Sequence, residues 1–351
     1  MNCTFLPILD TALSDEHLKS LLVSGNFEDP DLSRRVQRLE FLFHSASLTS
    51  PVPLWAPGLH IEREWRTVTE TFLPWAEIAP AFRRLISHAL RYPPPSDPLA
   101  PCPSWPDFLN RNSVGTASAD PSLLLRRLLT DEAVRCRWLF TLFLPKEHGG
   151  GFGRYPAQST FLRDWLTNRR SRKRTRLSCL DAACGCGEGT WELAQLCQEI
   201  GFQPEEVTLC GSSLDPLELF AATHAAFPHD ACREREYRLR IIPLIAAGFA
   251  ERIHFVWEDL TIITESTEKY DLILCNGLLG GPLLHEPERM ERVMAGLVRR
   301  LKPGGLILAA DRFHEGWRKL NPKKAREALL ARCGVRILES GEGIGGELSE
   351  G

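Results

Sequence analysis

The stretch Cys179-Leu180-Asp181-Ala182-Ala183-Cys184-Gly185-Cys186-Gly187-Glu188-Gly189-Thr190 decides the fold of this chain. An apolar run over 177–183 ends in an acidic and several small residues, and glycines then precede a helical pattern over 190–200. Glycine removes Cβ atoms from a sharp turn, so a ligand can approach the backbone there. The start of the following helix offers N–H groups to an anionic group such as a carboxylate. The stretch therefore predicts a strand, a ligand-binding turn and a helix.

Two familiar nucleotide sites do not fit this turn. A dinucleotide site requires a third glycine where the chain has Thr190, and a phosphate-binding P-loop requires a lysine followed by serine or threonine. What remains is an acidic residue at 181, a small residue at 183 and glycines at 185 and 187. The alternative is a tight strand-to-helix turn that binds nothing.

Downstream of this turn, strands and helices alternate. Apolar runs predict strands at 207–211, 253–257, 270–275, 305–310 and 335–338, and helices lie between them at 216–227, 237–249, 287–301 and 323–332. Such alternation requires crossover connections, which give an α/β fold with a doubly wound, mostly parallel sheet. Ligands of such a fold bind beyond the carboxyl ends of the strands.

The 351 residues divide into three predicted regions. Residues 1–150 are rich in proline and tryptophan and mainly helical, and residues 177–351 form the Rossmann-like domain. Between them, 151–176 holds a short helix and a basic connector with six basic residues among the eight of 169–176. We favour a solvated connector over a nucleic-acid or phosphate contact for this run, because the chain is not basic overall.

Composition excludes several classes of protein. Hydrophobic residues make up 43% and charged residues 25%, which excludes a disordered or fibrous chain. The net charge of −3 gives no general attraction to nucleic acid or anionic membranes. No apolar run approaches the ~18 residues of a membrane span, and the first residues do not resemble a signal peptide, so we expect a cytoplasmic protein. The 11 cysteines lack the paired spacing of a metal site, and we predict no metal.

The turn resembles motif I of class I methyltransferases that use S-adenosylmethionine. Three later stretches follow in the order of that superfamily: 209–216 where the ribose is held, 252–260 near the adenine, and 269–277 as the fourth strand. A further stretch, 301–308, contains its Leu-Lys-Pro-Gly-Gly turn. The resemblance implies S-adenosylmethionine as cofactor. It implies that the cofactor is bound by Arg154, Asp181, Ala183, Gly185, Gly187, Glu188, Ser213, Asp215, Asp259, Leu260 and Asn276.

Within this superfamily the chain is most similar to the chemotaxis-receptor (CheR-like) methyltransferases. Phe152-Gly153-Arg154-Tyr155-Pro156 resembles their short aromatic-arginine motif, and Asp181-Ala182-Ala183-Cys184 resembles their motif I. The chain departs from them where Ser213 replaces the ribose-binding carboxylate and where Asn276-Gly277 replaces an arginine-asparagine pair. That family methylates receptor glutamates, a substrate that we do not transfer to this chain.

The predicted reaction is direct in-line transfer of a methyl group to an unidentified acceptor. Positioning supplies much of the rate of such a transfer, and a base helps when the acceptor is an amine or hydroxyl. The candidate bases after the fourth and fifth strands are His285, Asp311 and His314, each of which has an alternative as a loop or surface residue. We favour a protein carboxylate or a small molecule as acceptor over nucleic acid, and expect no membrane partner.

Several residues keep two interpretations. Asp215 either binds the ribose or caps the helix that begins at Pro216. Glu188 either accepts from the cofactor ammonium or favours the helix N-terminus, and Arg154 either pairs with the cofactor carboxylate or caps a loop. Because Ser213 is neutral, the alternative function is a catalytically silent binding or scaffold module.

Overall fold

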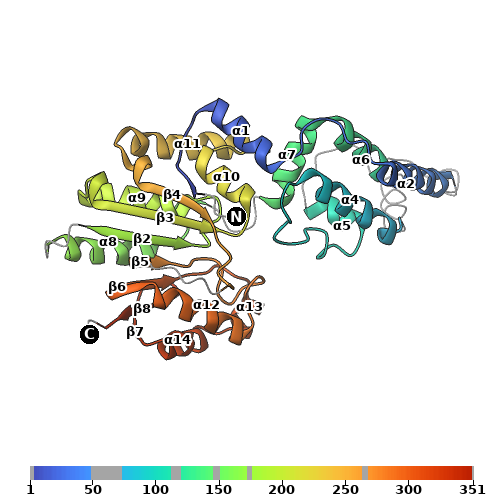
Figure 1. Cartoon of the computed structure of the whole chain (residues 1–351). Coiled ribbons are helices and arrows are strands. Elements are labelled where there is room, and N and C mark those ends of the chain that lie inside the picture. Colours follow the sequence, from blue (N-terminus) through green and yellow to red (C-terminus); the bar gives the residue numbers. More distant parts are fainter. Residues whose placement is uncertain are drawn as a thin grey trace, which may run out of the picture. The chain divides into compact units, whose positions relative to one another are not determined.

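The computed structural model describes residues 4–48, 73–111, 120–144, 151–171, 176–262 and 268–349 (Figure 1). Its contacts divide the chain into two compact units. One comprises Met1–Ser14, Gly149–Ala226 and Cys232–Gly351, and the other comprises Asp15–His148 and Phe227–Ala231. We describe each unit by itself.

The first unit is built on one eight-stranded sheet in the order β1-β4-β3-β2-β5-β6-β8-β7 (Figure 1). Neighbours among β2 to β6 run parallel, whereas β1 is antiparallel to β4, and β8 is antiparallel to β6 and β7. The strands are β1 (Thr4–Phe5), β2 (Leu177–Ala182), β3 (Val207–Ser213), β4 (Ile253–Trp257), β5 (Tyr270–Leu274), β6 (Leu301–Ala309), β7 (Val335–Leu338) and β8 (Ile344–Leu348). This confirms the predicted α/β fold, and the mostly parallel sheet has the strand order typical of class I methyltransferases.

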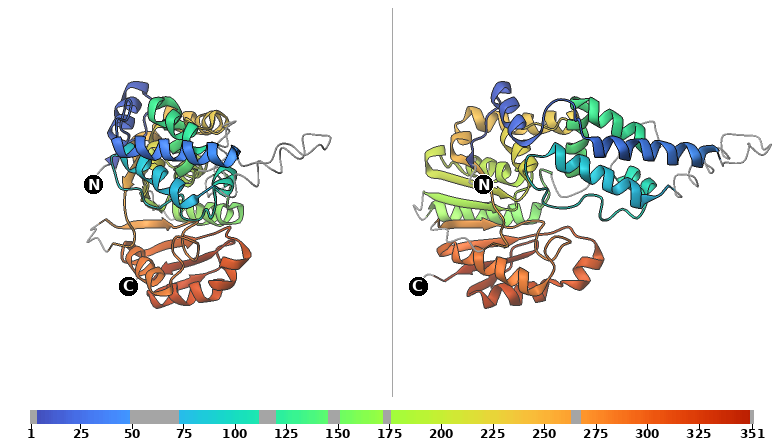
Figure 2. Two further views of the ribbon diagram at one scale, coloured as in Figure 1. Left: turned by 90° about the vertical axis from the view of Figure 1, so that its right-hand side faces the viewer. Right: turned by 45° about the vertical axis from the view of Figure 1, so that its right-hand side comes forward.

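Helices cover the sheet because its strands are apolar on both faces. Leu180, Ile273 and Ile307 lie in one buried cluster with residues of α12 and α14, two helices that contact each other (Figure 2). Side chains on the opposite face of β2 and β3 lie toward α9 and α10. The helices of this unit are α8 (Pro156–Ser171), α9 (Glu188–Ile200), α10 (Pro216–His224), α11 (Ala231–Ala246), α12 (Pro287–Arg299), α13 (Glu315–Leu320) and α14 (Lys323–Arg332).

The sequence did not indicate β8, because its Gly345-Gly346 pair has low strand propensity. The structure shows why small residues stand there. A Cβ on Gly345 would lie 2.9 Å from Leu308 Cδ2, and one on Gly346 would lie 2.6 Å from Val335 Cγ2. Close packing of β8 against its neighbours therefore requires residues that the usual strand pattern excludes.

Two arginines of the predicted basic connector lie at the end of α8. Arg169 pairs with Asp271 on β5, and Arg170 Nη1 lies 3.1 Å from Glu206 Oε2. Residues 172–175 of the connector lie outside the described residues. The two described arginines thus form ion pairs within the fold, and the side chain of Arg169 is only 11% exposed.

The second unit is helical and has an aromatic core. The rings of Phe82 and Trp105 stack 5.4 Å apart, and Phe108 and Trp138 pack on Phe82 at 5.6 and 5.8 Å. Residues 121–143 form two helices instead of one continuous helix, because the side chain of Asp131 caps the second at Val134 N. The helices that begin before residue 145 are α1 (Thr11–Leu21), α2 (Pro30–Leu48), α4 (Trp75–Ala89), α5 (Trp105–Arg111), α6 (Pro121–Thr130) and α7 (Glu132–Phe143).

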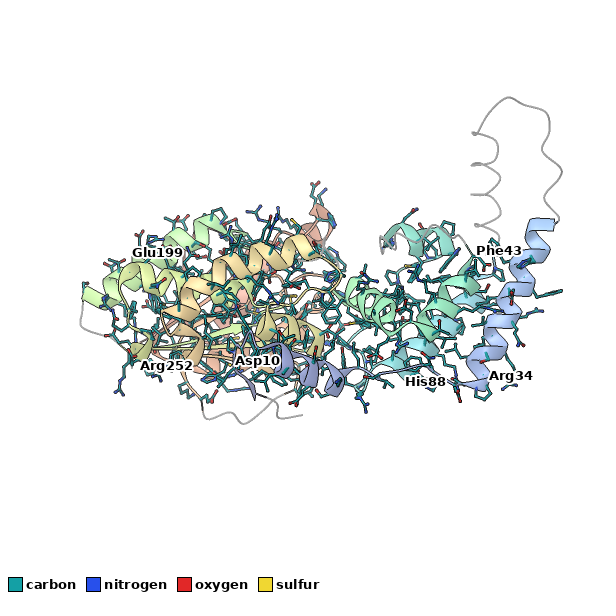
Figure 3. All side chains as sticks on the ribbon, turned by 90° about the horizontal axis from the view of Figure 1, so that it is seen from above. Asp10, Arg34, Phe43, His88, Glu199 and Arg252 are labelled. Atoms are coloured by element: carbon teal, nitrogen blue, oxygen red, sulfur yellow. The ribbon has the colours of Figure 1, made fainter. Side chains whose placement is uncertain are left out.

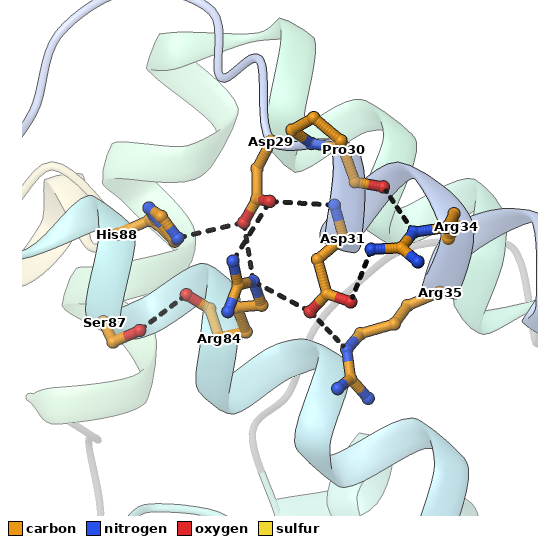
Figure 4. Close-up of polar contacts among 8 residues, drawn as sticks. All are labelled: Asp29, Pro30, Asp31, Arg34, Arg35, Arg84, Ser87 and His88. Atoms are coloured by element: carbon orange, nitrogen blue, oxygen red, sulfur yellow. Dashed lines mark hydrogen bonds and ion pairs between the residues drawn. The ribbon is translucent and has the colours of Figure 1, made fainter.

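A charged cluster joins the start of α2 to the last turns of α4 (Figure 4). Asp29 accepts from Arg84 Nε at 2.6 Å and lies 2.9 Å from His88 Nε2. The Arg84 guanidinium lowers the pKa of Asp29 to about 2. In Figure 3, Arg34 marks the end of α2 that carries this cluster, and Phe43 lies toward the opposite end. The cluster therefore fixes one end of α2 by electrostatic contacts.

Candidate functional site

The register of the parallel strands brings the predicted site residues to one edge of the sheet. Ala182 pairs with Ser212, and Ser213 pairs with Trp257, so β2, β3 and β4 end beside one another. Leu274 of β5 pairs with Leu308 of β6 on the other side of β2. The predicted cofactor and base residues lie at the ends of these strands or in the segments that follow them, except Arg154, which precedes the sheet in the chain.

The predicted glycine-rich turn connects β2 to α9 through three left-handed residues. Ala183, Gly185 and Gly187 have φ values of 61°, 57° and 84°. Backbone hydrogen bonds fix the turn, from Cys184 N to Ser212 O at 2.8 Å and from Gly187 N to Cys184 O at 3.0 Å. The N-cap residue of α9 is Gly187, which has no side chain of its own to cap the helix. The turn is therefore fixed by its backbone at the edge where the strands end.

Ala183 occupies a conformation that glycine adopts more easily. The left-handed region costs a non-glycine residue about 1–2 kcal/mol. Glycine avoids this cost but lowers the free energy of unfolding by about 0.4–1 kcal/mol, because it increases the conformational entropy of the unfolded chain. We expect Ala183→Gly to raise the free energy of unfolding by up to about 1 kcal/mol, measured by urea denaturation. Ala194→Gly, inside α9, is the control and should lower it by about 1 kcal/mol. A loss of stability in both variants would contradict the strain at Ala183.

The glycines of the turn differ in their surroundings. A Cβ on Gly187 would lie 2.8 Å from Ala222 Cβ and 3.0 Å from Phe255. A Cβ on Gly185 would meet only Glu218 Oε1, at 3.8 Å. Gly187 is therefore required by packing, whereas Gly185 leaves the turn open toward Glu218.

Asp181 ends β2 with its side chain directed into the protein. It is 5% exposed, and its Oδ2 accepts from Thr190 Oγ1 at 2.8 Å. Burial raises the pKa of Asp181 from 3.8 to about 7, against the opposing effect of the Thr190 hydrogen bond. The carboxyl thus braces α9 against β2 beneath the turn.

Glu188 begins α9 and is paired within the protein. Its buried carboxylate forms an ion pair with Arg233 of α11. Nearby, Tyr237 Oη donates to Cys186 O at 2.7 Å. The structure thus engages Glu188 with an arginine that the sequence analysis did not identify, and α11 holds the turn from behind.

Ser213, Asp215 and Glu218 lie together where β3 leads into α10. Asp215 Oδ1 caps α10 by accepting from Leu217 N at 2.9 Å. Ser213 Oγ donates to Glu218 Oε2 at 2.5 Å. Glu218 was not predicted as a site residue, because its position in the first turn of α10 is its only signal in the sequence.

The loop after β4 separates its two acidic residues. Glu258 pairs with Arg300 at 2.7 Å. Asp259 Oδ1 accepts from Thr261 N at 2.8 Å and from Thr261 Oγ1 at 2.6 Å, which closes the loop. Leu260 is partly buried against the core cluster. Asp259 therefore stabilises the conformation of this loop.

The aromatic-arginine motif meets the end of β5. Asn276 Nδ2 donates to Gln158 Oε1 at 2.8 Å, and Asn276 Oδ1 accepts from Ala310 N at 2.8 Å. Arg154 lies over the Tyr155 ring at 5.5 Å. The Tyr155 hydroxyl is buried without a hydrogen-bond partner among the described residues, and a Cβ on Gly277 would lie 3.8 Å from it. Gln158 is thus a site neighbour that the sequence did not indicate, and Tyr155 is one that it indicated only as part of the motif.

The three candidate bases have different environments. Asp311, 6% exposed at its side chain, pairs with Arg326 Nη1 at 2.7 Å. His314 is exposed at the start of α13. His285 packs on Trp317 with ring centres 5.0 Å apart, and its Nδ1 is buried without a partner among the described residues. Of the three, His285 alone combines burial with an unused nitrogen.

Cysteines surround the turn as neutral thiols. Burial raises the pKa of Cys184 and of Cys186 well above the ordinary value. In the described part of the chain, no three histidine, cysteine or acidic residues lie close enough to bind a metal ion together. Nor does any helix there have the length and apolarity that a membrane crossing requires.

No family model matches the chain, and no curated protein matches it in sequence. Solved structures match about half of it. The aminoglycoside resistance methyltransferase NpmB1 is 15% identical over 53% of this chain and 93% of its own, with a TM-score of 0.37. A TehB-like SAM-dependent methyltransferase from Corynebacterium glutamicum is 16% identical over 56% of this chain and 100% of its own, with a TM-score of 0.32. The antibiotic-resistance methyltransferase Kmr is 14% identical over 52% and 94%, with a TM-score of 0.32.

Proposed function

We propose that this protein binds S-adenosylmethionine at the turn between β2 and α9 and transfers its methyl group to an acceptor. One observation carries the proposal. The backbone is left-handed at Ala183, Gly185 and Gly187, and Gly187, as the N-cap residue of α9, has no side chain of its own to cap the helix. This arrangement lies at the edge of the sheet where ligands of this fold class bind.

The residues of the site fit the chemistry of this cofactor. A helix N-terminus favours a carboxylate such as that of the methionine moiety. The half-buried Glu218 carboxyl and the Ser213 hydroxyl supply polar groups beside the turn for the ribose. Asp259 stands after β4, the strand next to β3, where it can accept from an adenine amine.

When bound, the cofactor supplies a methyl group that is already activated by the sulfonium, so the chain needs no nucleophilic residue. Its own residues would position the acceptor and hold its proton. His285 is the base that we favour, because its Nδ1 is buried without a partner among the described residues. Asp311 acts through Arg326 to order the loop after β6.

For the acceptor we favour a protein carboxylate or a small molecule. The resemblance to the chemotaxis-receptor methyltransferases rests on short stretches such as 152–156 and 181–184, and Asn276-Gly277 departs from it. The second candidate is a module that binds a ligand without methyl transfer. It is favoured by the ion pairs of Glu188 and Asp311, because these two carboxylates are already engaged within the protein.

Calorimetric titration with S-adenosylhomocysteine and S-adenosylmethionine tests the proposal. We expect both to bind and to raise the melting temperature, since a ligand at a hundredfold excess over its Kd stabilises the native state by about 2.7 kcal/mol. NAD is the control and should have no effect, because the turn lacks the third glycine. The absence of binding by either adenosyl ligand at millimolar concentration would overturn the proposal. Binding without methyl transfer to any protein or small-molecule acceptor would favour the binding module.

A further inference from the structure

We infer that Glu218 supplies the ribose-binding carboxylate in place of an acidic residue at the end of β3, an inference that rests on the proposed cofactor site. The strand ends in the neutral Ser213, whose hydroxyl donates to Glu218 and accepts from Asp215 N, so only one acceptor lone pair remains for the two hydroxyls of a ribose. Glu218 reaches the same place from α10, five residues later in the chain.

The geometry directs Glu218 toward the turn. Its Oε2 accepts from Ser213 Oγ at 2.5 Å, and its Oε1 lies 3.8 Å from the position that a Cβ on Gly185 would take. Because Gly185 has no side chain, the space between this oxygen and the backbone of the turn contains no Cβ. A ribose over the turn would therefore meet Glu218 Oε1.

The first turn of α10, which carries Glu218, is fixed by several contacts. Asp215 caps α10 from Leu217 N, and Pro216 stands in the first turn of the helix. Asp215 N donates to Ser213 Oγ at 3.2 Å, which leaves the serine hydroxyl hydrogen for Glu218. The capping role of Asp215 thus serves to orient Glu218.

The charges around Glu218 leave it without a cation of its own. Arg233 is the cation whose charge acts on Glu218, and it forms an ion pair with Glu188. Burial raises the pKa of the Glu218 carboxyl, and the charge of Glu188 adds to the shift. Glu218 forms no ion pair among the described residues. Two O–H donors from a ribose would supply partners that the protein does not provide.

Calorimetry with a matched pair of ligands tests this role. The probes are S-adenosylhomocysteine and its 2′-deoxy analogue, titrated into the wild-type protein and into Glu218→Gln. We expect the wild type to bind the deoxy analogue at least about tenfold more weakly, because a hydrogen bond to the carboxylate is lost. Glu218→Gln should bind S-adenosylhomocysteine about tenfold more weakly than the wild type and distinguish the two ligands by less than about threefold.

Two controls make the outcome decisive. Glu205→Gln changes an exposed carboxylate away from the turn and should leave both affinities unchanged. Glu218→Ala, checked for folding by circular dichroism, should lose the same discrimination. If either Glu218 variant still distinguishes the two ligands as the wild type does, Glu218 only braces Ser213 and the inference is overturned. If the wild type binds neither ligand, the proposed cofactor site itself is wrong and the inference falls with it.

Discussion

Gly187→Val is expected to destabilise the whole domain, as well as to abolish cofactor binding. The residue has φ of 84°, and its Cβ would lie 2.8 Å from Ala222 Cβ and 3.0 Å from Phe255. The left-handed conformation costs about 1–2 kcal/mol, and overpacking a buried site costs about 1–3 kcal/mol more. Chemical denaturation should therefore show a loss of about 2–5 kcal/mol in the free energy of unfolding.

Gly185→Ala is the matched control, because it changes the same turn where there is space. Its Cβ would meet only Glu218 Oε1, at 3.8 Å, so only the conformational cost of about 1–2 kcal/mol applies. This variant should fold, and its loss of S-adenosylhomocysteine binding should exceed its loss of stability. Equal destabilisation by the two changes would show that the packing around Gly187 is not as described.

The fold was predictable because its signals are local. The apolar run before Asp181 and the glycines after it identify a strand and a turn, and the alternation of strands and helices then gives a parallel sheet. The β8 strand escaped prediction because Gly345 and Gly346 are selected by contacts with Leu308 and Val335, residues distant in sequence. A pattern within one segment carries no record of such contacts.

The position of the candidate site could be predicted from the sequence, but the side chains that pair with its residues could be predicted only in part. The sequence indicates that Glu188 and Asp311 follow strands, but it cannot show that Arg233 and Arg326 reach them from helices elsewhere in the chain. Glu218 escaped because the carboxylate was sought on β3, whereas a side chain from the next helix reaches the same place. Motif spacing fixes the backbone at the site, and tertiary packing decides which side chains face it.

Asp181→Asn is expected to stabilise the protein without ligand at alkaline pH. Burial raises the pKa of Asp181 from 3.8 to about 7, and Glu192 and Glu188 add to the shift. Because the native state binds this proton more tightly than the unfolded state does, the wild type loses stability as pH rises from about 4 to about 7, by about 1.4 kcal/mol per pH unit at most. The total is a few kcal/mol. Asparagine carries no charge, and its side-chain oxygen still accepts from Thr190 Oγ1.

Urea denaturation at about pH 5 and about pH 8 measures the effect, since the two values span most of the titration. The free energy of unfolding of the variant should increase relative to that of the wild type between these two pH values. Asp271→Asn is the control, because Asp271 is equally buried, at 5% exposed, but is paired with Arg169 and with Lys302 at 2.8 Å. Removing one partner from a buried ion pair costs about 3–5 kcal/mol, so this change should destabilise the protein. The two aspartates lie on neighbouring strands of one sheet, so opposite signs would show that cationic partners, rather than burial alone, decide the effect of each carboxylate. If Asp181→Asn gained no stability relative to the wild type between the two pH values, the carboxyl of Asp181 would titrate near its ordinary pKa, and the expectation would be wrong.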